Sequence, residues 1–150
     1  MLVHVWSVLC LKSVIDQESN NITLMDCLEQ INLKASPLPL ASASISLPVN
    51  YEMVSFFTRA DDNQPSRGEG RVSIVGPLGT VIEEPISIIV DLTTHERIRV
   101  RNRIAGLPIR GSGRYKFLVQ YRNDGESNWI DAARVPLQVV LEASEEVAQR

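Results

Sequence analysis

The chain is poor in the residues that most often build metal sites and nucleophilic active sites. Its 150 residues include two histidines, His4 and His95, and two cysteines, Cys10 and Cys27. No two of these four residues lie at a short ligand spacing, so we predict no metal site and no bound cofactor. Two cysteines are also too few for a disulfide scaffold, and we expect both to be reduced and buried.

Catalytic signatures are missing as well. The sequence has neither a G-x-S-x-G elbow nor a Cys-His motif. The two glycines of "RGSGRY" precede a predicted strand rather than a helix, which argues against a phosphate-binding loop at that point. We therefore predict that the protein is not an enzyme, assign no catalytic residue and identify no small-molecule substrate.

Long hydrophobic runs are also absent. No apolar run approaches the roughly 18 to 20 residues of a membrane-spanning helix. The opening "MLVHVWSVLCLK" has no basic start and no A-x-A-like cleavage site, so we interpret it as a buried strand rather than a signal peptide. These features predict a soluble cytoplasmic protein with no membrane partner.

Positive charge is carried almost entirely by arginine. The net charge is −3, which gives no general attraction to nucleic acid. Arginine occupies twelve positions and lysine three, namely Lys12, Lys34 and Lys116. This bias favours planar, bidentate pairing with carboxylates over diffuse solvation.

What the chain does contain is a series of β-strands. Segments rich in Val, Ile, Phe and Tyr alternate with turn residues and predict eight strands, near residues 2–11, 22–33, 49–60, 70–76, 80–90, 97–104, 113–122 and 129–141. The prolines Pro37, Pro39 and Pro48 make the segment before the third strand a long crossover. We predict an all-β fold, an antiparallel β-sandwich of seven to nine strands. It forms one domain over residues 1–141, followed by a flexible or short helical tail over residues 142–150.

Alternation of side chains predicts which faces of the last strands turn inward. One inward row is Tyr115, Phe117, Val119 and Tyr121, and the matching row is Val135, Leu137, Val139 and Leu141. Asp124-Gly125 predicts the hairpin turn between them, and Ala132-Ala133 marks a bulge. We expect the large aromatic residues to fill the core, including Trp6, Trp129, Phe56, Phe57 and Tyr51.

One strand carries a row of four arginines. In "HERIRVRNRIAG", Arg97, Arg99, Arg101 and Arg103 occupy every second position. Desolvating one unpaired guanidinium costs several kcal/mol, more than exposing three aliphatic side chains, so Ile98, Val100, Asn102 and Ile104 should face the core. The arginines then point outward and form our candidate binding surface.

We expect this strand to form a hairpin with the preceding one. Setting Ile89 opposite Arg97 places Ile86 and Ile88 on the core face and pairs Glu83 with Arg103 and Ser87 with Arg99. A slip by one residue would place aliphatic side chains among the arginines. Parity therefore selects this register.

Three roles are open for the arginine row. It could be a solvent-facing strip, partly neutralised by Glu83 and by Glu52 on a neighbouring strand, that prevents edge-to-edge pairing. It could bind a carboxylate-rich protein partner, including a second copy of this chain. As the alternative, it could bind nucleic acid or another polyphosphate, although the negative net charge and the scarcity of exposed aromatics argue against nucleic acid. We predict a protein-interaction or assembly module.

Loop carboxylates leave calcium as a further hypothesis. Asp61, Asp62 and Asp124 fall in predicted loops, and calcium sites use such oxygen ligands. The same residues are equally typical of ordinary turns.

Segments of the sequence resemble two groups of known proteins. "RIRVRNRIAGLPIRGSGRYKFLVQY" is similar to the stretch of an immunoglobulin-like sandwich that leads into its sixth strand, with Tyr115 at the position of the tyrosine that often begins that strand. "NNITLMDCLEQINL", "GRVSIVGPLGTV", "GRYKFLVQY" and "ARVPLQVV" resemble a family of small uncharacterised bacterial proteins, a domain of unknown function. Where that family often has glycine, this chain has Asn20-Asn21, which also adopts left-handed turns. The resemblance implies no activity.

Overall fold

The structure is a computed structural model that describes residues 1–35 and 44–143. Nine strands occur in these residues: β1 (Leu2–Ile15), β2 (Ile22–Cys27), β3 (Gln30–Ala35), β4 (Ile45–Arg59), β5 (Ser66–Val75), β6 (Ile86–Leu92), β7 (Arg97–Ile109), β8 (Gly113–Asn123) and β9 (Ile130–Ala143). β9 continues two residues past the predicted domain end at Leu141. The rest of the predicted tail, residues 144–150, and the prolines Pro37 and Pro39 lie outside the described residues.

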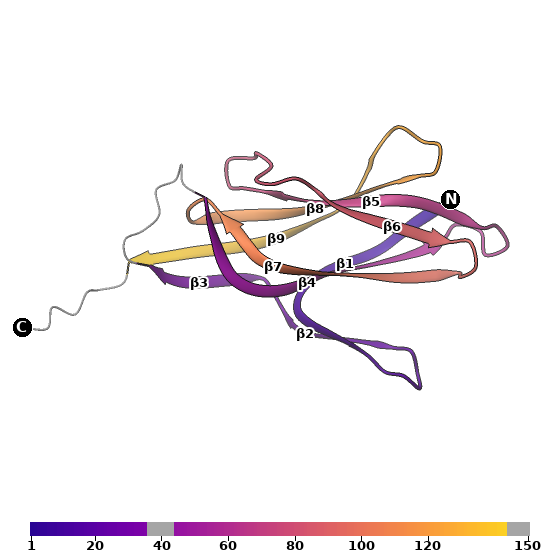
Figure 1. Cartoon of the computed structure of the whole chain (residues 1–150), viewed down its shortest axis with the longest axis horizontal. Coiled ribbons are helices and arrows are strands. Elements are labelled where there is room, and N and C mark those ends of the chain that lie inside the picture. Colours follow the sequence, from indigo (N-terminus) through magenta and orange to yellow (C-terminus); the bar gives the residue numbers. More distant parts are fainter. Residues whose placement is uncertain (36–43, 144–150) are drawn as a thin grey trace, which may run out of the picture.

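The strands form two sheets, as Figure 1 shows. The first has four strands in the order β2-β1-β4-β7, and the second has five in the order β3-β9-β8-β5-β6. All pairings are antiparallel except that of β3 with β9. The all-β, mostly antiparallel prediction is therefore confirmed, and the arrangement is compatible with a β-sandwich.

Aromatic contacts across the two sheets mark the centre of the core. Tyr51 of β4 meets Phe117 of β8 edge to face at 5.9 Å between ring centroids, and Phe57 meets Tyr121 at 5.8 Å. Such pairs contribute about 0.5–1.5 kcal/mol beyond the area they bury. One continuous cluster of buried side chains extends from these rings through both sheets.

The predicted alternation in β8 and β9 is confirmed. Tyr115, Phe117 and Val119 are fully buried, as are Leu137 and Val139. β8 and β9 pair antiparallel, and the register shifts where Val119 opposes Ala133 but Gln120 opposes Asp131. Ala132 is thus the extra residue, as the predicted bulge required.

Several strand bounds differ from the prediction. Pro48, predicted to lie in the crossover before the third strand, lies inside β4, where the register with β7 shifts between Leu47 and Asn50 and an irregular ladder can accept a residue without an N–H. The expected strand over residues 22–33 is split into β2 and β3, which belong to different sheets. Asp26 has a φ of 53°, a left-handed conformation that disrupts a regular strand. The expected strand over residues 80–90 is shorter, because β6 begins only at Ile86.

The predicted hairpin between residues 80–90 and 97–104 is wrong. β6 pairs with β5 in the five-stranded sheet, whereas β7 pairs with β4 in the four-stranded sheet. The proposed pairs of Glu83 with Arg103 and Ser87 with Arg99 therefore do not form. Alternation restricts the register of two strands once they are known to pair. It does not determine which strands pair, because β6 and β7 can each bury an apolar row against the opposite sheet.

Several residues expected in the core lie elsewhere. Trp6 and Phe56 form a tilted pair 5.6 Å apart on the outer side of the four-stranded sheet. Trp129 lies against the guanidinium groups of Arg71 and Arg122, 4.2 and 4.5 Å from its ring centroid. Cys10 is buried as predicted, but Cys27 is exposed because β2 is an edge strand. Among the described residues there is no helix of the length and hydropathy needed to cross a membrane.

Candidate functional site

The four arginines lie on β7, at one edge of the four-stranded sheet. Ile98, Val100 and Ile104 pack against the core, as the alternation predicted, and the arginines occupy the opposite face. Their cross-strand partners on β4 include Phe56 for Arg99 and Glu52 for Arg103. The row is not evenly exposed, because Arg97 and Arg103 are open to solvent while Arg99 and Arg101 are half-buried.

A bulge in β1 prepares the surface beside this row. The register between β1 and β4 shifts between His4 and Trp6, which makes Val5 an extra residue and reverses the alternation. Leu2 and Leu9 consequently both reach the core, whereas Trp6 lies over Phe56 on the outer face. A regular strand could not place both leucines inside and the tryptophan outside at these positions.

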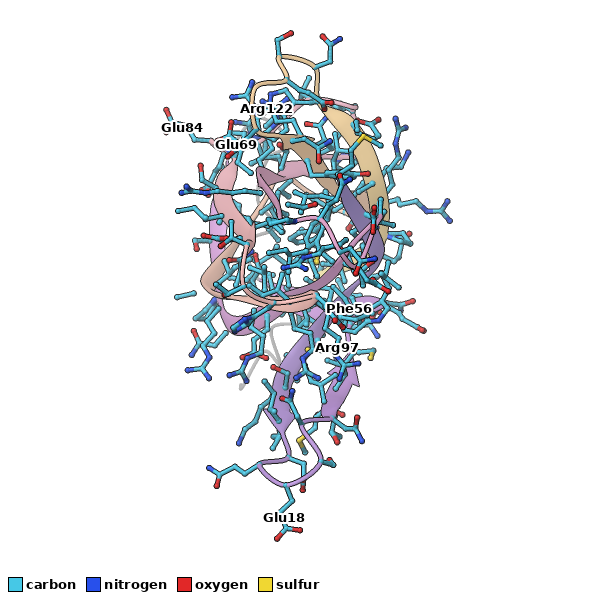
Figure 2. All side chains as sticks on the ribbon, turned by 90° about the vertical axis from the view of Figure 1, so that its right-hand side faces the viewer. Glu18, Phe56, Glu69, Glu84, Arg97 and Arg122 are labelled. Carbon is cyan, nitrogen blue, oxygen red and sulfur yellow. The ribbon has the colours of Figure 1, made fainter. Side chains whose placement is uncertain are left out.

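The far part of β1 and all of β2 form a hairpin arm, residues 11–27, that leaves the sheet. Figure 2 shows the arm extending past Phe56 and Arg97, with Glu18 at its far end. The last pairing of β1 with β4 is that of Cys10 with Glu52, so beyond it the arm is held by β2 and by side-chain contacts. The arm could not be predicted from the sequence, since the alternation of two strands does not reveal where the hairpin that joins them will lie.

Two arginines of the row hold the arm. Arg99 donates from Nη1 to the backbone oxygen of Asn20 and from Nη2 to its Oδ1, both at 2.7 Å. Arg101 donates over longer distances to the backbone oxygen and the Oγ of Ser13, at 3.5 and 3.4 Å. Asn20 has a φ of 56° and supplies the left-handed turn expected of Asn20-Asn21. The centre of the arginine row is therefore occupied by the chain itself.

Arg103 has a carboxylate partner on the neighbouring strand, Glu52, as the sequence suggested. Its Nε donates to Glu52 Oε1 at 3.1 Å, and the Glu52 side chain is only 7% exposed. Burial alone would raise the pKa of Glu52, but Ser13 and the Arg103 guanidinium beside it outweigh burial and hold the pKa below its ordinary value. This end of the row is thus neutralised.

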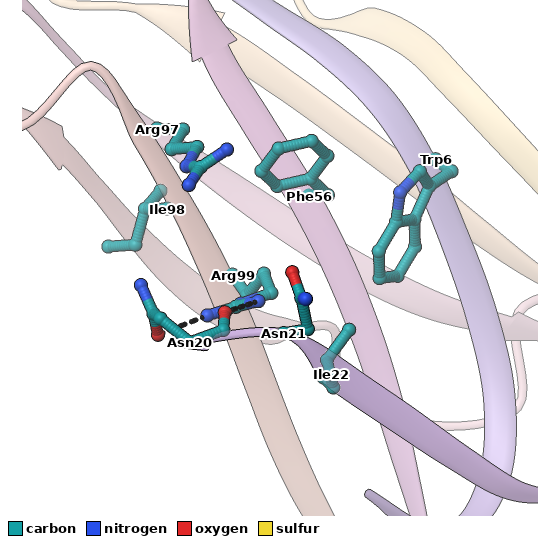
Figure 3. A pocket seen from close by; sticks show the side chains of 8 residues that line it. All are labelled: Trp6, Asn20, Asn21, Ile22, Phe56, Arg97, Ile98 and Arg99. Carbon is teal, nitrogen blue, oxygen red and sulfur yellow. Dashed lines mark hydrogen bonds between the residues drawn. The ribbon is translucent and has the colours of Figure 1, made fainter. Parts of the chain in front are cut away.

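Arg97 remains as the available cation of the row. It is exposed, and among the described residues it has no carboxylate within ion-pair distance and no side-chain hydrogen bond. It borders a cleft of about 380 Å³ between the arm and the sheet, shown in Figure 3. The lining residues are Trp6, Asn20, Asn21, Ile22, Phe56, Arg97, Ile98 and Arg99.

The chemistry of this cleft is mixed. Trp6, Phe56 and Ile22 offer apolar and aromatic surface, and Arg97 offers a planar donor fork that matches a carboxylate or a phosphate. The amide side chains of Asn20 and Asn21 add polar groups at the arm. Such a site can orient an anionic group beside an apolar one, and the eight described lining residues include no paired nucleophile and base.

The loop carboxylates considered for calcium do not converge. Asp61 Oδ1 accepts the backbone N–H of Asn63, and Asp124 lies 4.0 Å from the Arg67 guanidinium. No group of three or more His, Cys, Asp or Glu side chains comes together within residues 1–35 and 44–143. In the structure these residues serve turns and a surface ion pair.

No family model matches the chain, and no curated protein matches it. The resemblance to a family of small bacterial proteins stays a prediction.

Proposed function

We propose that this protein is a non-catalytic binding module that takes an acidic segment of a partner protein into the cleft beneath the hairpin arm. The observation that carries this proposal is the exposed Arg97 beside the Trp6–Phe56 pair. A glutamate or aspartate next to an apolar residue would satisfy both features at once. Arginine and aromatic residues together are characteristic of protein interfaces.

Charge supports a short acidic segment over a polyphosphate. Of the four arginines, Arg99 and Arg101 hold the arm and Arg103 holds Glu52. A nucleic acid would need several available cations along its path, whereas one carboxylate needs one. The whole chain has a net charge of −3, so attraction to an acidic partner must be local.

We also propose that the two sheets form an immunoglobulin-like sandwich. The Tyr115 hydroxyl donates to the backbone oxygen of Gly111 at 2.7 Å and accepts the Arg110 N–H at 2.6 Å. A tyrosine that bonds back to the backbone a few residues upstream of its strand is a recurrent feature of that fold. An experimental structure whose strand order is compared with that of immunoglobulin domains would test this assignment.

The chain offers an internal probe for the cleft. It has two tryptophans, and Trp6 lines the cleft while Trp129 lies between arginines of the other sheet. In a Trp129→Phe variant, Trp6 is the sole tryptophan, so its fluorescence reports on the cleft. We expect a peptide that alternates glutamate with leucine to change this fluorescence saturably, and the same peptide with lysine in place of glutamate to leave it unchanged.

A matched pair of charge reversals tests the site. Arg97→Glu should weaken binding roughly three- to tenfold, since exposed ion pairs are worth up to about 1 kcal/mol and reversal adds repulsion. Arg114→Glu makes the same change in charge on the exposed face of β8 and should leave binding unchanged. Equal loss in both variants would refute the cleft as the site.

Two other results would also overturn the proposal. Fluorescence that responds to a single-stranded oligonucleotide but not to the acidic peptide would favour the anion-binding alternative. Fluorescence that depends on protein concentration alone, with dimer formation in sedimentation, would identify a second copy of the chain as the occupant.

A further inference from the structure

The two cysteines lie opposite each other at the base of the hairpin arm. Cys10 of β1 and Cys27 of β2 are cross-strand partners in the antiparallel ladder. Both are free thiols, Cys10 with no exposed surface and Cys27 exposed. They are 17 positions apart in sequence, so their pairing is created by the fold and is not a local motif.

One backbone hydrogen bond fixes the type of this pair. The Leu28 N–H donates to the Leu9 carbonyl at 2.8 Å. In an antiparallel ladder this bond belongs to the position next to Cys10 and Cys27, which makes the cysteines a non-hydrogen-bonded pair. Side chains of such a pair lie on one side of the ladder, and their Cα atoms are about 4.5 Å apart. That spacing lies within the range of roughly 4.4–6.8 Å that disulfides span.

We propose that Cys10 and Cys27 are a thiol pair that closes to a cross-strand disulfide on reaction with a low-molecular-weight disulfide such as glutathione disulfide. The Cys27 thiolate attacks one sulfur of the small disulfide and releases one small thiolate, which leaves a mixed disulfide on Cys27. The Cys10 thiolate then attacks the Cys27 sulfur and releases the second. The two cysteines are oxidised, their two protons pass to the two departing thiolates, and the small disulfide is reduced to two thiols.

Exposure sets the order of these steps. Cys27 is open to solvent and is the thiol that a small disulfide reaches first. Cys10 is covered. Burial, and to a smaller extent the nearby Glu52 carboxylate, raises the pKa of its thiol. Cys10 therefore reacts only with a sulfur already held opposite it, which is the role of a resolving cysteine.

The disulfide would constrain the hairpin arm alone. The bond would close residues 10–27 into a ring whose far end is the turn that contacts Arg99. It would fix the edge strand β2 to β1 at the point where β1 leaves β4. This modification is independent of whether the cleft binds an acidic segment.

Trypsin provides a direct readout on the full native chain. Cleavage after Lys12 and Lys34 places Cys10 in residues 1–12 and Cys27 in residues 13–34. After incubation of the folded protein with glutathione disulfide and trapping of free thiols, we expect these two peptides to be linked, with the mass of the intact chain lowered by two hydrogen atoms. Amide exchange in β2 should slow roughly tenfold and recover on reduction.

Single-cysteine variants supply the controls. In Cys10→Ser, a glutathione adduct should persist on Cys27, whereas in the natural chain it should be transient. Cys27→Ser should acquire no adduct, because Cys10 is covered. A stable adduct on Cys27 of the natural chain, a disulfide-linked dimer, or two unlinked peptides would each overturn the proposal.

Discussion

Tyr115 joins a buried ring to an exposed turn. Its ring is fully buried, and its hydroxyl makes the two bonds to the backbone at Arg110 and Gly111. Burial raises the pKa of this hydroxyl, and the hydrogen bond from the Arg110 N–H offsets part of that increase. The tyrosine is therefore neutral at ordinary pH and acts as both donor and acceptor.

Removing that hydroxyl gives a first prediction. Tyr115→Phe keeps the ring but leaves the Arg110 N–H and the Gly111 carbonyl without their partner. We expect the free energy of unfolding to fall by about 1–3 kcal/mol, as measured in urea. Tyr121→Phe is the control, because the Tyr121 hydroxyl makes no side-chain hydrogen bond among the described residues. An equal effect in both variants would contradict this account.

His4 gives a second prediction, on pH. Its Nε2 lies 2.8 Å from Ser7 Oγ and its ring meets Phe57 edge to face, and burial lowers its pKa below 6.5. The unfolded chain then binds a proton more readily than the folded one, so stability should fall as the pH decreases through about 6.5. His4→Gln should show a smaller loss between neutral pH and about pH 5 in the same unfolding assay. A larger loss in the variant would reverse the sign argued here.

The stability of the hairpin arm formed by β1 and β2 depends on Asn20. This residue holds a left-handed backbone and also accepts a hydrogen bond from Arg99 through its side chain. Asn20→Gly keeps the backbone conformation but loses the side-chain acceptor, and Asn20→Ala loses both. We expect amide protection in β2 to decrease from Asn to Gly to Ala, with the alanine variant about 1–2 kcal/mol below the glycine variant. Equal protection in Gly and Ala would show that the backbone is unstrained.

Alternation correctly predicted which side chains of a strand face the core. It placed Tyr115, Phe117 and Leu137 inside, identified the bulge at Ala132-Ala133 and turned the arginines of β7 outward. These features follow from the two-residue period of a strand and the cost of burying charge, which are both local. The sequence was therefore sufficient for which face of a strand is buried.

Pairing between strands was not predictable in the same way. β6 and β7 are adjacent in sequence and compatible in parity, yet they lie in different sheets because each packs its apolar row against the other layer. The cleft was missed for a related reason. Trp6 and Phe56 have the composition of core residues, and only the Val5 bulge and the arm place them outside. Both outcomes depend on contacts distant in sequence.

For the molecule as a whole, β7 is an edge that carries charge. Within residues 1–35 and 44–143, β7 pairs with β4 alone, so its other side presents unpaired backbone groups. Charged side chains on an edge strand oppose pairing with another molecule. We therefore expect the arginine row to oppose edge-to-edge pairing in addition to bordering the proposed cleft.

A fourth prediction tests this protection. Replacing Arg97 and Arg101 with threonine should produce concentration-dependent association, measured by sedimentation or light scattering. Replacing Arg114 and Lys116 with threonine removes the same charge from β8, which lies inside the five-stranded sheet between β9 and β5. That control should stay at its original mass. Association in both variants would attribute the effect to net charge rather than to the edge.

The parallel pairing of β3 with β9 joins the early and late parts of the chain. Gln30 lies opposite Gln138, and Ala35 opposite Ala143. Residues through Ala143 must therefore leave the ribosome before β3 can pair fully with β9, and closing so large a loop slows folding. Until β9 has emerged during synthesis, the five-stranded layer is incomplete and the edges of its earlier strands are open to incorrect pairing.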